Sequence, residues 1–271
     1  MNKISVIIPT YNGSKFIYKT LESALNQDYH NFEVIVIDDY STDDSVEIVT
    51  TFMESYTNLE LIKNDRNMGI SKTINTAVSI ASGEYLVFLG HDDLIEKKHL
   101  SIMYSEMNNN NAIMVHCNSN VIDSEDNFMK KAVIDAKQIV YSNNAMYTLS
   151  KINFVHNVGY IVNKKIYVKY NQFGKYKNYG EWLSWIEFAK HGKIYYTNKV
   201  FSYYRRHETN ITNTFSDLNV IKDMQIYSRE CRKKAKSFSE NNLYKNLIYL
   251  LNYFYYEIIY FLRIFKRKLK L

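Results

Sequence analysis

The sequence predicts an α/β fold with a central, mostly parallel β-sheet flanked by helices. Three observations lead to this prediction. Short apolar runs of branched and aromatic residues recur at 4–8, 32–37 and 85–89, and each is too short for a typical helix. Helical patterns separate these runs, as in βαβ units with right-handed crossovers. Two of the runs end on paired carboxylates, which is typical of strands whose carboxyl ends face a ligand.

The predicted elements follow one another without long gaps. The first strand leads through the turn TYNG into a helix that ends near Leu25. After the second strand, Ser41-Thr42-Asp43-Asp44 supplies an N-cap and an acidic first turn for a helix that ends near Met53. The other predicted strands are 59–63, 112–121 and 154–162; the other predicted helices are 71–81, 94–107, 181–190 and 217–236, and 123–144 is a loop with a short helix.

The charge of the chain is unevenly distributed. Hydrophobic residues make up 46% and charged residues 23%, which is an ordinary globular balance, and the net charge is +6. Residues 229–271 carry eleven Lys and Arg against three Asp and Glu, a net +8, so the preceding residues carry −2. Because a nucleic-acid enzyme spreads cationic surface over its body, this asymmetry favours attraction of the tail to an anionic surface instead.

Cysteine usage and the N-terminus favour a cytoplasmic setting. Cys117 and Cys231 are the only cysteines, and neither belongs to a metal-type spacing, so we expect both to be reduced. The first apolar run meets Pro9 too early for a signal peptide, and it predicts a first strand.

The stretch EYLVFLGHDD, residues 84–93, contains the most informative carboxylates. A buried central strand ends at Gly90, and Asp92 and Asp93 follow where the chain leaves the sheet. Paired carboxylates at such an edge suit Mg²⁺ or Mn²⁺ shared with substrate phosphates. On this stretch alone, the alternative that both residues cap the following helix stays open.

A second acidic pair strengthens the prediction of a ligand site. Asp38 and Asp39 end the second strand, and the turn at 10–13 emerges at the same sheet edge, so the three segments together predict a nucleotide pocket. The alternative is that each is an ordinary turn or cap. The chain has neither GxGxxG after the first strand nor GxxxxGK[ST], so a metal has to neutralise a diphosphate here.

Four ordered motifs resemble those of a known family. SVIIPTYNG, VIVIDDYSTDDS, NMGISKTINTAVSIASGEYLVFLGHDD and YYRRHETNIT are similar to segments of the inverting family 2 glycosyltransferases, over residues 3–213. The resemblance implies the GT-A nucleotide-diphospho-sugar transferase fold for residues 1–215. Residues 216–271 are then a helical, basic and aromatic C-terminal tail.

The resemblance also implies a donor site and a metal site. The residues expected to bind the nucleotide-sugar donor are Pro9, Thr10, Tyr11, Asn12, Asp39, Asp92, Arg205 and His207. The family's metal-binding motif, Asp-x-Asp-Asp, is replaced here by Gly90-His91-Asp92-Asp93. Asp93 is expected to bind Mn²⁺ or Mg²⁺ directly, with Asp92 on the ribose or the metal.

On the acceptor side, Glu181 occupies the position of the family's catalytic Asp. A carboxylate within reach of the acceptor hydroxyl can deprotonate it, and the alternative is that Glu181 only stabilises a helix N-terminus. His91 is expected to contact the donor sugar or to bond nearby backbone. Trp182 is expected to stack on a sugar ring, whereas Trp185 has the helical spacing of a core residue.

The tail predicts an amphipathic helix over 241–270. Leu, Ile and Phe side chains gather on one face, but Asn252, Glu257 and Arg263 interrupt the apolar run, which is too short to span a membrane. We expect this helix to lie in the interface of an anionic membrane, which makes the enzyme a peripheral protein of the inner face of the cell membrane. Packing on the chain's own domain or on a dimer partner is the alternative.

The function predicted from these observations is sugar transfer. The chain is expected to be a metal-dependent, inverting glycosyltransferase that moves a sugar from a nucleotide-sugar, most simply a UDP-sugar, to a hydroxyl of a glycan or lipid-linked acceptor in cell-surface polysaccharide or lipooligosaccharide synthesis. A nucleotidyltransferase is one alternative, although TYNGSKF is poor in glycine and lysine for its phosphate loop. The other is a degenerate, non-catalytic sugar-nucleotide-binding subunit, which Gly90 and Glu181 suggest.

Overall fold

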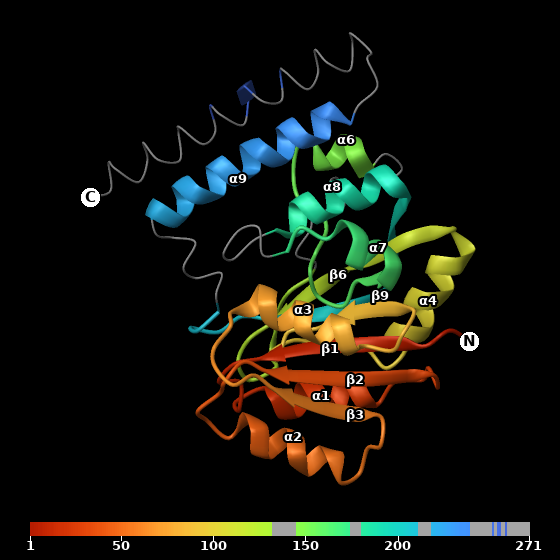
Figure 1. The fold of residues 1–271 in the computed structure, drawn as a ribbon, viewed down its shortest axis with the longest axis vertical. Helices are drawn as coiled ribbons and strands as arrows, with labels where there is room; N and C mark the ends of the chain where they lie inside the picture. Colours follow the sequence, from red (N-terminus) through yellow and green to blue (C-terminus); the bar gives the residue numbers. More distant parts are fainter. Residues whose placement is uncertain are drawn as a thin grey trace.

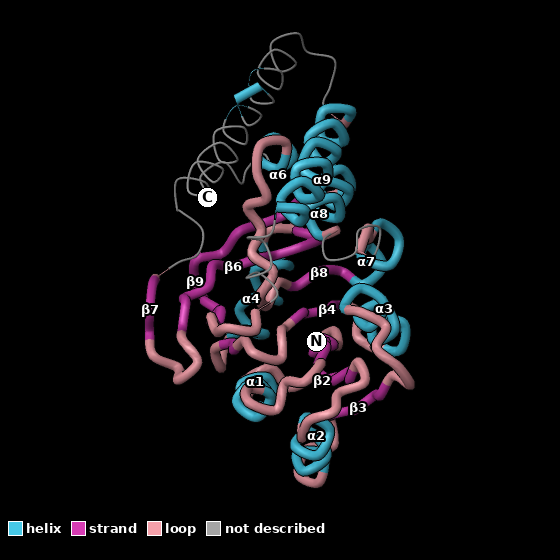
Figure 2. Tube along the Cα trace, turned by 90° about the vertical axis from the view of Figure 1, so that its left-hand side faces the viewer, coloured by secondary structure: helices cyan, strands magenta, loops and turns pink. Residues whose placement is uncertain are grey.

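The computed structural model describes residues 1–131, 145–173, 180–210 and 218–238, together with residues 251, 254, 255 and 258. Within these residues the strands form one sheet in the order β3-β2-β1-β4-β8-β6-β9-β5, and β7 pairs with β6. Helices cover both faces of this sheet (Figures 1 and 2). The prediction of an α/β fold is therefore confirmed.

The N-terminal half of the sheet is parallel. It contains β1 (Ile4–Thr10), β2 (Phe32–Asp38), β3 (Leu59–Lys63) and β4 (Tyr85–Phe88), which coincide with the four predicted strands. Each of the three pairs in this half is parallel. Their carboxyl ends therefore meet at one edge of the sheet, where ligands bind in open α/β folds.

The C-terminal half of the sheet is mixed. Its strands are β5 (Leu94–Ile95), β6 (Ala112–Ile122), β7 (Phe128–Lys130), β8 (Ile161–Asn163) and β9 (Lys193–Arg205). The short β8 is antiparallel to both of its neighbours, β4 and β6, whereas β6 and β9 are parallel to each other.

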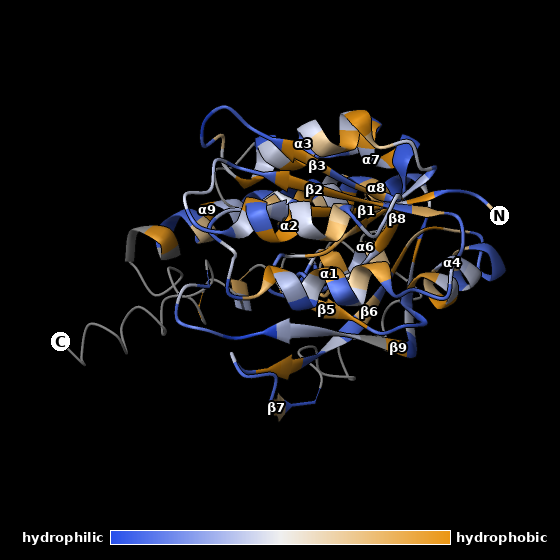
Figure 3. Cartoon of the chain, turned by 90° about the horizontal axis from the view of Figure 1, so that it is seen from below, coloured by the Kyte–Doolittle hydropathy of each residue, from blue (hydrophilic) through white to orange (hydrophobic). Residues whose placement is uncertain are grey.

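Two hydrophobic clusters lie on opposite faces of the sheet. Alternate residues of β1, such as Val6 and Ile8, pack against α1 (Ile17–Leu25), α2 (Ser45–Met53) and α4 (His99–Asn109). Residues of the other parity, such as Ile7, lie in the cluster of α3 (Ile70–Ile80), α6 (Ala145–Leu149), α7 (Lys164–Tyr170), α8 (Glu181–His191) and α9 (Leu218–Ser237). Figure 3 shows the strands β1 to β3 coloured mainly as hydrophobic and the connecting loops mainly as hydrophilic.

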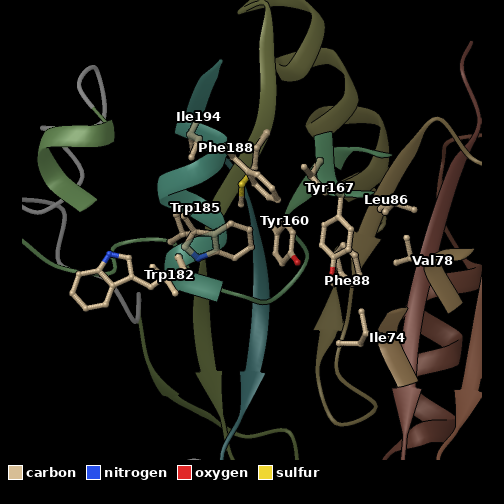
Figure 4. Packing of buried hydrophobic residues seen from close by; sticks show 14 of the residues in the cluster. Ile74, Val78, Leu86, Phe88, Tyr160, Tyr167, Trp182, Trp185, Phe188 and Ile194 are labelled. Atoms are coloured by element: carbon tan, nitrogen blue, oxygen red, sulfur yellow. The ribbon is translucent and has the colours of Figure 1, made fainter. Parts of the chain in front are cut away.

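Aromatic rings join β4 to the helices of the second half of the chain (Figure 4). The ring of Phe88 stacks on Tyr160 and Tyr167 with centroid distances of 5.1 Å and 4.9 Å. Trp185 packs edge-on against Tyr160 at 4.8 Å and is fully buried, which confirms its predicted place in the core. Because these rings lie directly behind the end of β4, they give the loop after β4 a rigid base.

The segment 123–144, predicted as a loop with a short helix, contains β7, and its residues 132–144 lie outside the described residues. Two further predicted elements differ from the structure. The helix predicted from residue 94 begins at His99, because Leu94 and Ile95 pair with β9 instead. The strand predicted over 154–162 is reduced to β8 by Gly159, whose φ of +72° is incompatible with an extended strand. A Cβ atom at Gly159 would lie 2.7 Å from the ring of His99, so both space and backbone require glycine there.

The last helix described in full, α9, is packed on the main body of the chain. Tyr227, Cys231 and Ala235 belong to the same buried cluster as α8. The backbone N–H of Leu183 donates to the Tyr227 hydroxyl at 3.2 Å. Residues 218–238 therefore share the core of the preceding domain, and a boundary between 215 and 216 stays a prediction.

The predicted tail helix at 241–270 lies outside the described residues, except for four positions. Leu251, Phe254, Tyr255 and Ile258 are helical, and 56–61% of each is exposed. In the described ranges, no helix is both long and apolar enough to cross a membrane.

A polar network joins the amino ends of β1, β2 and β4. The carboxylate of Glu33 accepts hydrogen bonds from the Ser5 hydroxyl at 2.6 Å and the Ser82 backbone at 2.7 Å, and it pairs with Lys3 at 2.6 Å. Burial by itself raises the pKa of Glu33, but these partners outweigh it and lower the pKa to about 2. The charged form of Glu33 therefore stabilises the start of the sheet.

We expect Glu33→Gln to lower the free energy of unfolding by about 1–2 kcal/mol at pH 7. A depressed pKa contributes stability above the unfolded value, which is near 4.5, and loses it as the pH falls towards about 2. The difference between wild type and variant should therefore narrow over that range in urea unfolding curves. A difference that stays constant from pH 7 to pH 3 would contradict this account.

Candidate active site

Two adjoining clefts lie at the carboxyl edge of the parallel strands. The first, the Asp39 cleft, has a volume of about 650 Å³, and the second, the Glu181 cleft, has about 460 Å³. Pro9, Ile70, Gly90 and Tyr204 line both clefts. The two spaces therefore meet beside Gly90, at the end of β4.

The turn after β1 forms one wall of the Asp39 cleft. Pro9, Thr10, Tyr11 and Asn12 all line it, as predicted for a nucleotide site. The Thr10 hydroxyl is buried and has no hydrogen-bond partner among the described residues. Asn12 adopts a left-handed φ of 49°. Its side-chain oxygen accepts a hydrogen bond from the Thr42 backbone N–H at 2.9 Å, which joins this turn to the segment after β2.

Asp39 organises the opposite wall. Its carboxylate accepts hydrogen bonds from the backbone N–H groups of Met68 and Gly69 at 2.7 Å and 2.8 Å, and from the Asn64 amide at 2.8 Å. A carboxylate has about four lone-pair positions, so room remains for one more donor. Asp39 is therefore both a support for the loop at 67–69 and a possible ligand for a nucleoside.

The turn after β4 brings two carboxylates together. A Cβ atom at Gly90 would lie 2.7 Å from Asp92 Oδ1 and 3.0 Å from Asp93 Oδ2, so both oxygens face the space that a side chain would fill. The replacement of the family's first Asp by Gly90 thus leaves room for this arrangement. The described residues contain no group of three or more His, Cys, Asp or Glu side chains that could hold a metal ion.

The electrostatics of this pair suit a divalent cation. Burial raises the pKa of Asp93 well above its ordinary value, and the neighbouring Asp92 carboxylate raises it further. A cation beside the two oxygens would remove this repulsion and favour the charged form. Two carboxylates with phosphate oxygens and water are a sufficient donor set for Mg²⁺ or Mn²⁺, so the residues present fit the predicted metal.

The segment after β9 closes over the acidic turn. His207 Nε2 and the Asn210 amide lie 2.9 Å and 3.2 Å from Asp92 Oδ2. The His207 ring also packs on Phe16 with a centroid distance of 4.6 Å. His207, Thr209 and Asn210 line the Asp39 cleft, so this segment brings an imidazole and an amide to the Asp92 carboxylate.

Arg205 lies behind the acidic turn and not in the cleft. Its side chain is only 1% exposed, its Nε donates to the Asp92 carbonyl at 2.8 Å, and its backbone N–H donates to Asp93 Oδ1 at 3.0 Å. The guanidinium also pairs with Asp126. This placement corrects the expected binding of the donor by Arg205, because its side chain is buried and its guanidinium is held by Asp126 and by the carbonyls of Asp92 and Asp123. Arg205 is a positioning residue for Asp92 and Asp93.

The position of His91 is compatible with both of its predicted roles, contact with the donor sugar and bonding to nearby backbone. It lines the Asp39 cleft, and its backbone carbonyl accepts from the Thr20 hydroxyl at 2.8 Å. Its ring packs directly on Gly13, where a Cβ atom would lie 2.6 Å from the imidazole. The ring is therefore held against the nucleotide turn by contact with glycine.

Glu181 lines the second cleft from the first turn of α8. Its carboxylate accepts from the Gly180 backbone at 3.0 Å and from the Asn157 amide at 3.2 Å. Burial raises the pKa of Glu181, which brings the carboxylate closer to the strength required of a base at neutral pH. Glu181 and Asp93 line the same cleft.

Trp182 does not reach either cleft. It is 8% exposed, belongs to the buried cluster, and its indole N–H donates to the Leu149 carbonyl at 2.8 Å. Figure 4 shows the ring on the side of α8 away from β4. This corrects the expectation that Trp182 stacks on a sugar: as the residue after Glu181, it lies on a different face of α8.

The sequence interpretation missed several residues of the site. The residues that line a cleft or hold a site carboxylate without having been assigned a role include Asn64, Asn67, Gly69, Thr73, His156, Asn157, Tyr204, Thr209 and Asn210. Gly69 and Asn210 lie inside the family-like motifs, which was a usable signal. His156 and Asn157 lie in a segment predicted as a strand, so nothing local pointed to them.

We expect Arg205→Met to lower the free energy of unfolding by about 3 kcal/mol, because it leaves Asp126 and the Asp92 carbonyl without their buried partner. The matched control is Arg206→Met at the exposed neighbouring position, for which we expect less than about 0.5 kcal/mol. Both are measured by denaturant unfolding. Equal effects of the two substitutions would contradict the positioning role.

Comparison with known sequences gives consistent relatives. An uncharacterized glycosyltransferase of Haemophilus influenzae is 36% identical over 141 residues, which cover 52% of this chain and 56% of that protein. The Escherichia coli protein WfaP, a UDP-Glc:alpha-D-GlcNAc-diphosphoundecaprenol beta-1,3-glucosyltransferase, is 43% identical over 93 residues, or 34% of this chain and 36% of that protein. The chain thus spans about half or less of the length of these relatives.

Solved structures show the same fold. Staphylococcus aureus TarS 1-349 in complex with UDP-GlcNAc has a TM-score of 0.64 at 18% identity, covering 92% of this chain and 79% of that one. The mannosyltransferase PcManGT from Pyrobaculum calidifontis, in complex with GDP-Man and Mn²⁺, has a TM-score of 0.61 at 16% identity, covering 91% and 78%. The predicted GT-A fold is confirmed. The profile of Glycosyl transferase family 2 matches residues 5–170, more than half of the sequence, and the chain belongs to this family.

Proposed function

We propose that the chain is an inverting, metal-dependent glycosyltransferase that transfers a sugar from a nucleotide-sugar to a hydroxyl acceptor. The observation that carries the proposal is the meeting of two clefts beside Gly90. One cleft is lined by Asp39 and Asp92, and the other by Glu181 and Asp93. A donor in the first cleft and an acceptor in the second would have their reacting atoms at this junction.

The donor is proposed to lie in the Asp39 cleft. The remaining lone pair of Asp39 can bind the nucleoside, and Tyr11 offers a half-exposed ring in the same cleft. Asp93 and Asp92, with His207 beside them, would hold Mn²⁺ or Mg²⁺. When bound, the cation supplies neutralisation of the diphosphate as it leaves. A UDP-sugar is supported by the relatives named for UDP-Glc and UDP-GlcNAc, although PcManGT binds GDP-Man.

Glu181 is proposed as the catalytic base. It accepts the proton of the acceptor hydroxyl, whose oxygen then attacks the anomeric carbon on the side opposite the departing diphosphate. The C–O bond to the acceptor forms as the bond to the diphosphate breaks, which inverts the anomeric centre. The hydrogen bonds from Asn157 and Gly180 orient the carboxylate for this step.

The acceptor is proposed to be a glycan or a lipid-linked sugar in the synthesis of a cell-surface polysaccharide or lipooligosaccharide. The name of WfaP, which acts on a diphosphoundecaprenol-linked sugar, supports a lipid-linked acceptor. A peripheral position at the inner face of the cell membrane would bring the enzyme to such a substrate. The exposed apolar side chains of Leu251, Phe254, Tyr255 and Ile258 support this position.

The membrane proposal predicts binding to anionic vesicles. The intact chain should sediment with vesicles that contain phosphatidylglycerol and bind weakly to phosphatidylcholine alone, with a loss of binding as salt is raised. Replacing Leu251 and Phe254 by Ser should weaken this binding. Equal binding of the chain to both kinds of vesicle would favour the alternatives, in which the tail binds a dimer partner or packs on its own domain. Sedimentation velocity distinguishes these two, because only the first gives a dimer.

The donor site is tested first by calorimetric titration. We expect one nucleotide diphosphate sugar from a panel of UDP-, GDP- and CDP-sugars to bind in the presence of Mn²⁺ and to be lost on chelation. Asp93→Ala should abolish this metal-dependent binding, whereas the exposed Asp223→Ala should not change it. Binding without transfer to any acceptor would favour the non-catalytic subunit, and absence of all nucleotide binding would reject the proposed function.

The base is tested by Glu181→Gln. We expect kcat to fall by about 10²- to 10⁴-fold while donor binding persists, because the amide cannot accept the proton. Glu187→Gln on the same helix, whose carboxylate pairs with Lys234 at 2.8 Å, is the matched control and should remain active. Full activity of Glu181→Gln would contradict the assignment of Glu181 as the catalytic base.

The raised pKa of Glu181 predicts the pH dependence of wild-type activity and the thermal stability of Glu181→Gln. In wild type, activity should be lost as the pH falls through the raised pKa, which lies above the ordinary value of 4.5 for Glu. A carboxyl group with a raised pKa also loses stability as the pH rises, so Glu181→Gln should melt at the same temperature as wild type or higher at pH 7.

A further inference from the structure

A titratable group without a role in the proposed function lines the Glu181 cleft beside the proposed base. His156 belongs to the loop between α6 and β8, and its ring packs edge-on against Tyr204 with a centroid distance of 5.6 Å. Its neighbour Asn157 donates to the Glu181 carboxylate at 3.2 Å. His156 and Glu181 are therefore linked through one residue and face the same space.

One ring nitrogen of His156 is anchored on a chain of buried hydroxyls. His156 Nδ1 lies 2.8 Å from the Ser119 hydroxyl, which in turn contacts the Ser202 hydroxyl, its partner in the register of β6 and β9. Ser202 donates to the Val158 carbonyl at 3.1 Å. Ser119 and Ser202 are fully buried, so these contacts are not replaced by solvent.

Only one arrangement of protons satisfies all three contacts. A carbonyl cannot donate, so the single hydroxyl proton of Ser202 goes to Val158, and Ser202 must accept from Ser119. The proton of Ser119 is then used, and Ser119 must accept from His156 Nδ1–H. The chain of hydroxyls therefore selects the tautomer with the proton on Nδ1 and leaves Nε2 as a hydrogen-bond acceptor.

The Nε2 atom is available to a ligand. Among the described residues it has no hydrogen-bond partner, and it is not one of the buried polar atoms that lack one, so it retains access to the cleft. Burial lowers the pKa of His156 to about 4, so the ring stays neutral near pH 7. Because Nε2 carries no proton, it can accept a hydrogen bond from a hydroxyl group.

We propose that His156 Nε2 accepts a hydrogen bond from a second hydroxyl of the acceptor sugar, and so determines which hydroxyl meets Glu181. This inference rests on the proposed function. The Glu181 carboxylate and the unprotonated Nε2 of His156 are two hydrogen-bond acceptors in one cleft. They can accept hydrogen bonds from two hydroxyl groups of one sugar ring, such as a pyranose. Because the hydroxyls of a pyranose have fixed relative positions, fixing one of them fixes the position of the other.

The tautomer can be tested without any transfer. Long-range hydrogen–nitrogen NMR of the labelled intact chain at pH 7 should show His156 with a proton on Nδ1 and none on Nε2. The signal is assigned by its absence in His156→Gln. Ser202→Ala, which breaks the hydroxyl chain, should give a mixture of tautomers. A proton on Nε2 in wild type would overturn the inference and would leave the proposed function intact.

The hydrogen bond to the substrate is tested with octyl glycosides as acceptor probes. For a glycoside that wild type glycosylates, removal of the second hydroxyl in a monodeoxy analogue should lower kcat/KM by about three- to tenfold. In His156→Leu this penalty should disappear, and products linked at another position should increase. His156→Gln, which can still present an oxygen, should keep part of the penalty.

The control is His30→Leu at an exposed position outside both clefts, which should behave as wild type. An unchanged deoxy penalty and unchanged linkage in His156→Leu would overturn the inference. Failure of wild type to glycosylate any probe, together with absence of nucleotide binding, would count instead against the proposed function.

Discussion

The site depends on how one buried arginine holds the turn after β4. Arg205 is at the end of β9, yet its side chain and backbone both bond to the Asp92–Asp93 pair. The same guanidinium pairs with Asp126 in the turn between β6 and β7. Since the two carboxylates repel each other beside Gly90, they need a cation behind them that does not occupy the ligand space. Arg205 provides it, because its burial places the charge on the protein side.

The two clefts differ in the hydrogen bonding and the pKa values of their polar groups. In the Asp39 cleft, carboxylates are already bonded by backbone and side chains, with Met68 and Gly69 on Asp39 and His207 on Asp92. In the Glu181 cleft, burial shifts the pKa of several titratable groups, upward for Glu181 and Asp93 and downward for His156. The first arrangement suits binding of a charged ligand. The second keeps proton acceptors weakly solvated, which suits recognition and deprotonation of hydroxyls.

The loop between α6 and β8 connects these features to the core. Gly159, with its positive φ, ends the strand early, and its backbone N–H donates to the Phe88 carbonyl at 2.8 Å. The residues before it are thereby turned out of the sheet and into the Glu181 cleft. Tyr160, directly after it, stacks on Phe88 and packs edge-to-face against Trp185. The aromatic core thus anchors the segment that carries His156 and Asn157.

Much of the first half could be predicted from the sequence, since its signals are local. The apolar runs that became β1 to β4 alternate with helices, and the carboxyl ends of parallel strands must meet, so Asp39, Asp92 and Asp93 were expected at one edge. The turn at 10–13 was expected at the same edge, and the motif resemblance added His207; Thr10, Tyr11 and His207 all line the Asp39 cleft. It misled at Arg205 and Trp182, because a motif gives the residue type and not the direction of the side chain.

The order of the elements, the edge at which the carboxylates gather and the family follow from local sequence, because apolar period, turn residues and motif spacing are properties of neighbouring positions. Which groups face the ligand depends instead on tertiary contacts. Arg205 is turned inward by partners far away in the chain, Asp92 and Asp126, and His156 is oriented by serines on β6 and β9. Such contacts join residues dozens of positions apart, and no local pattern encodes them.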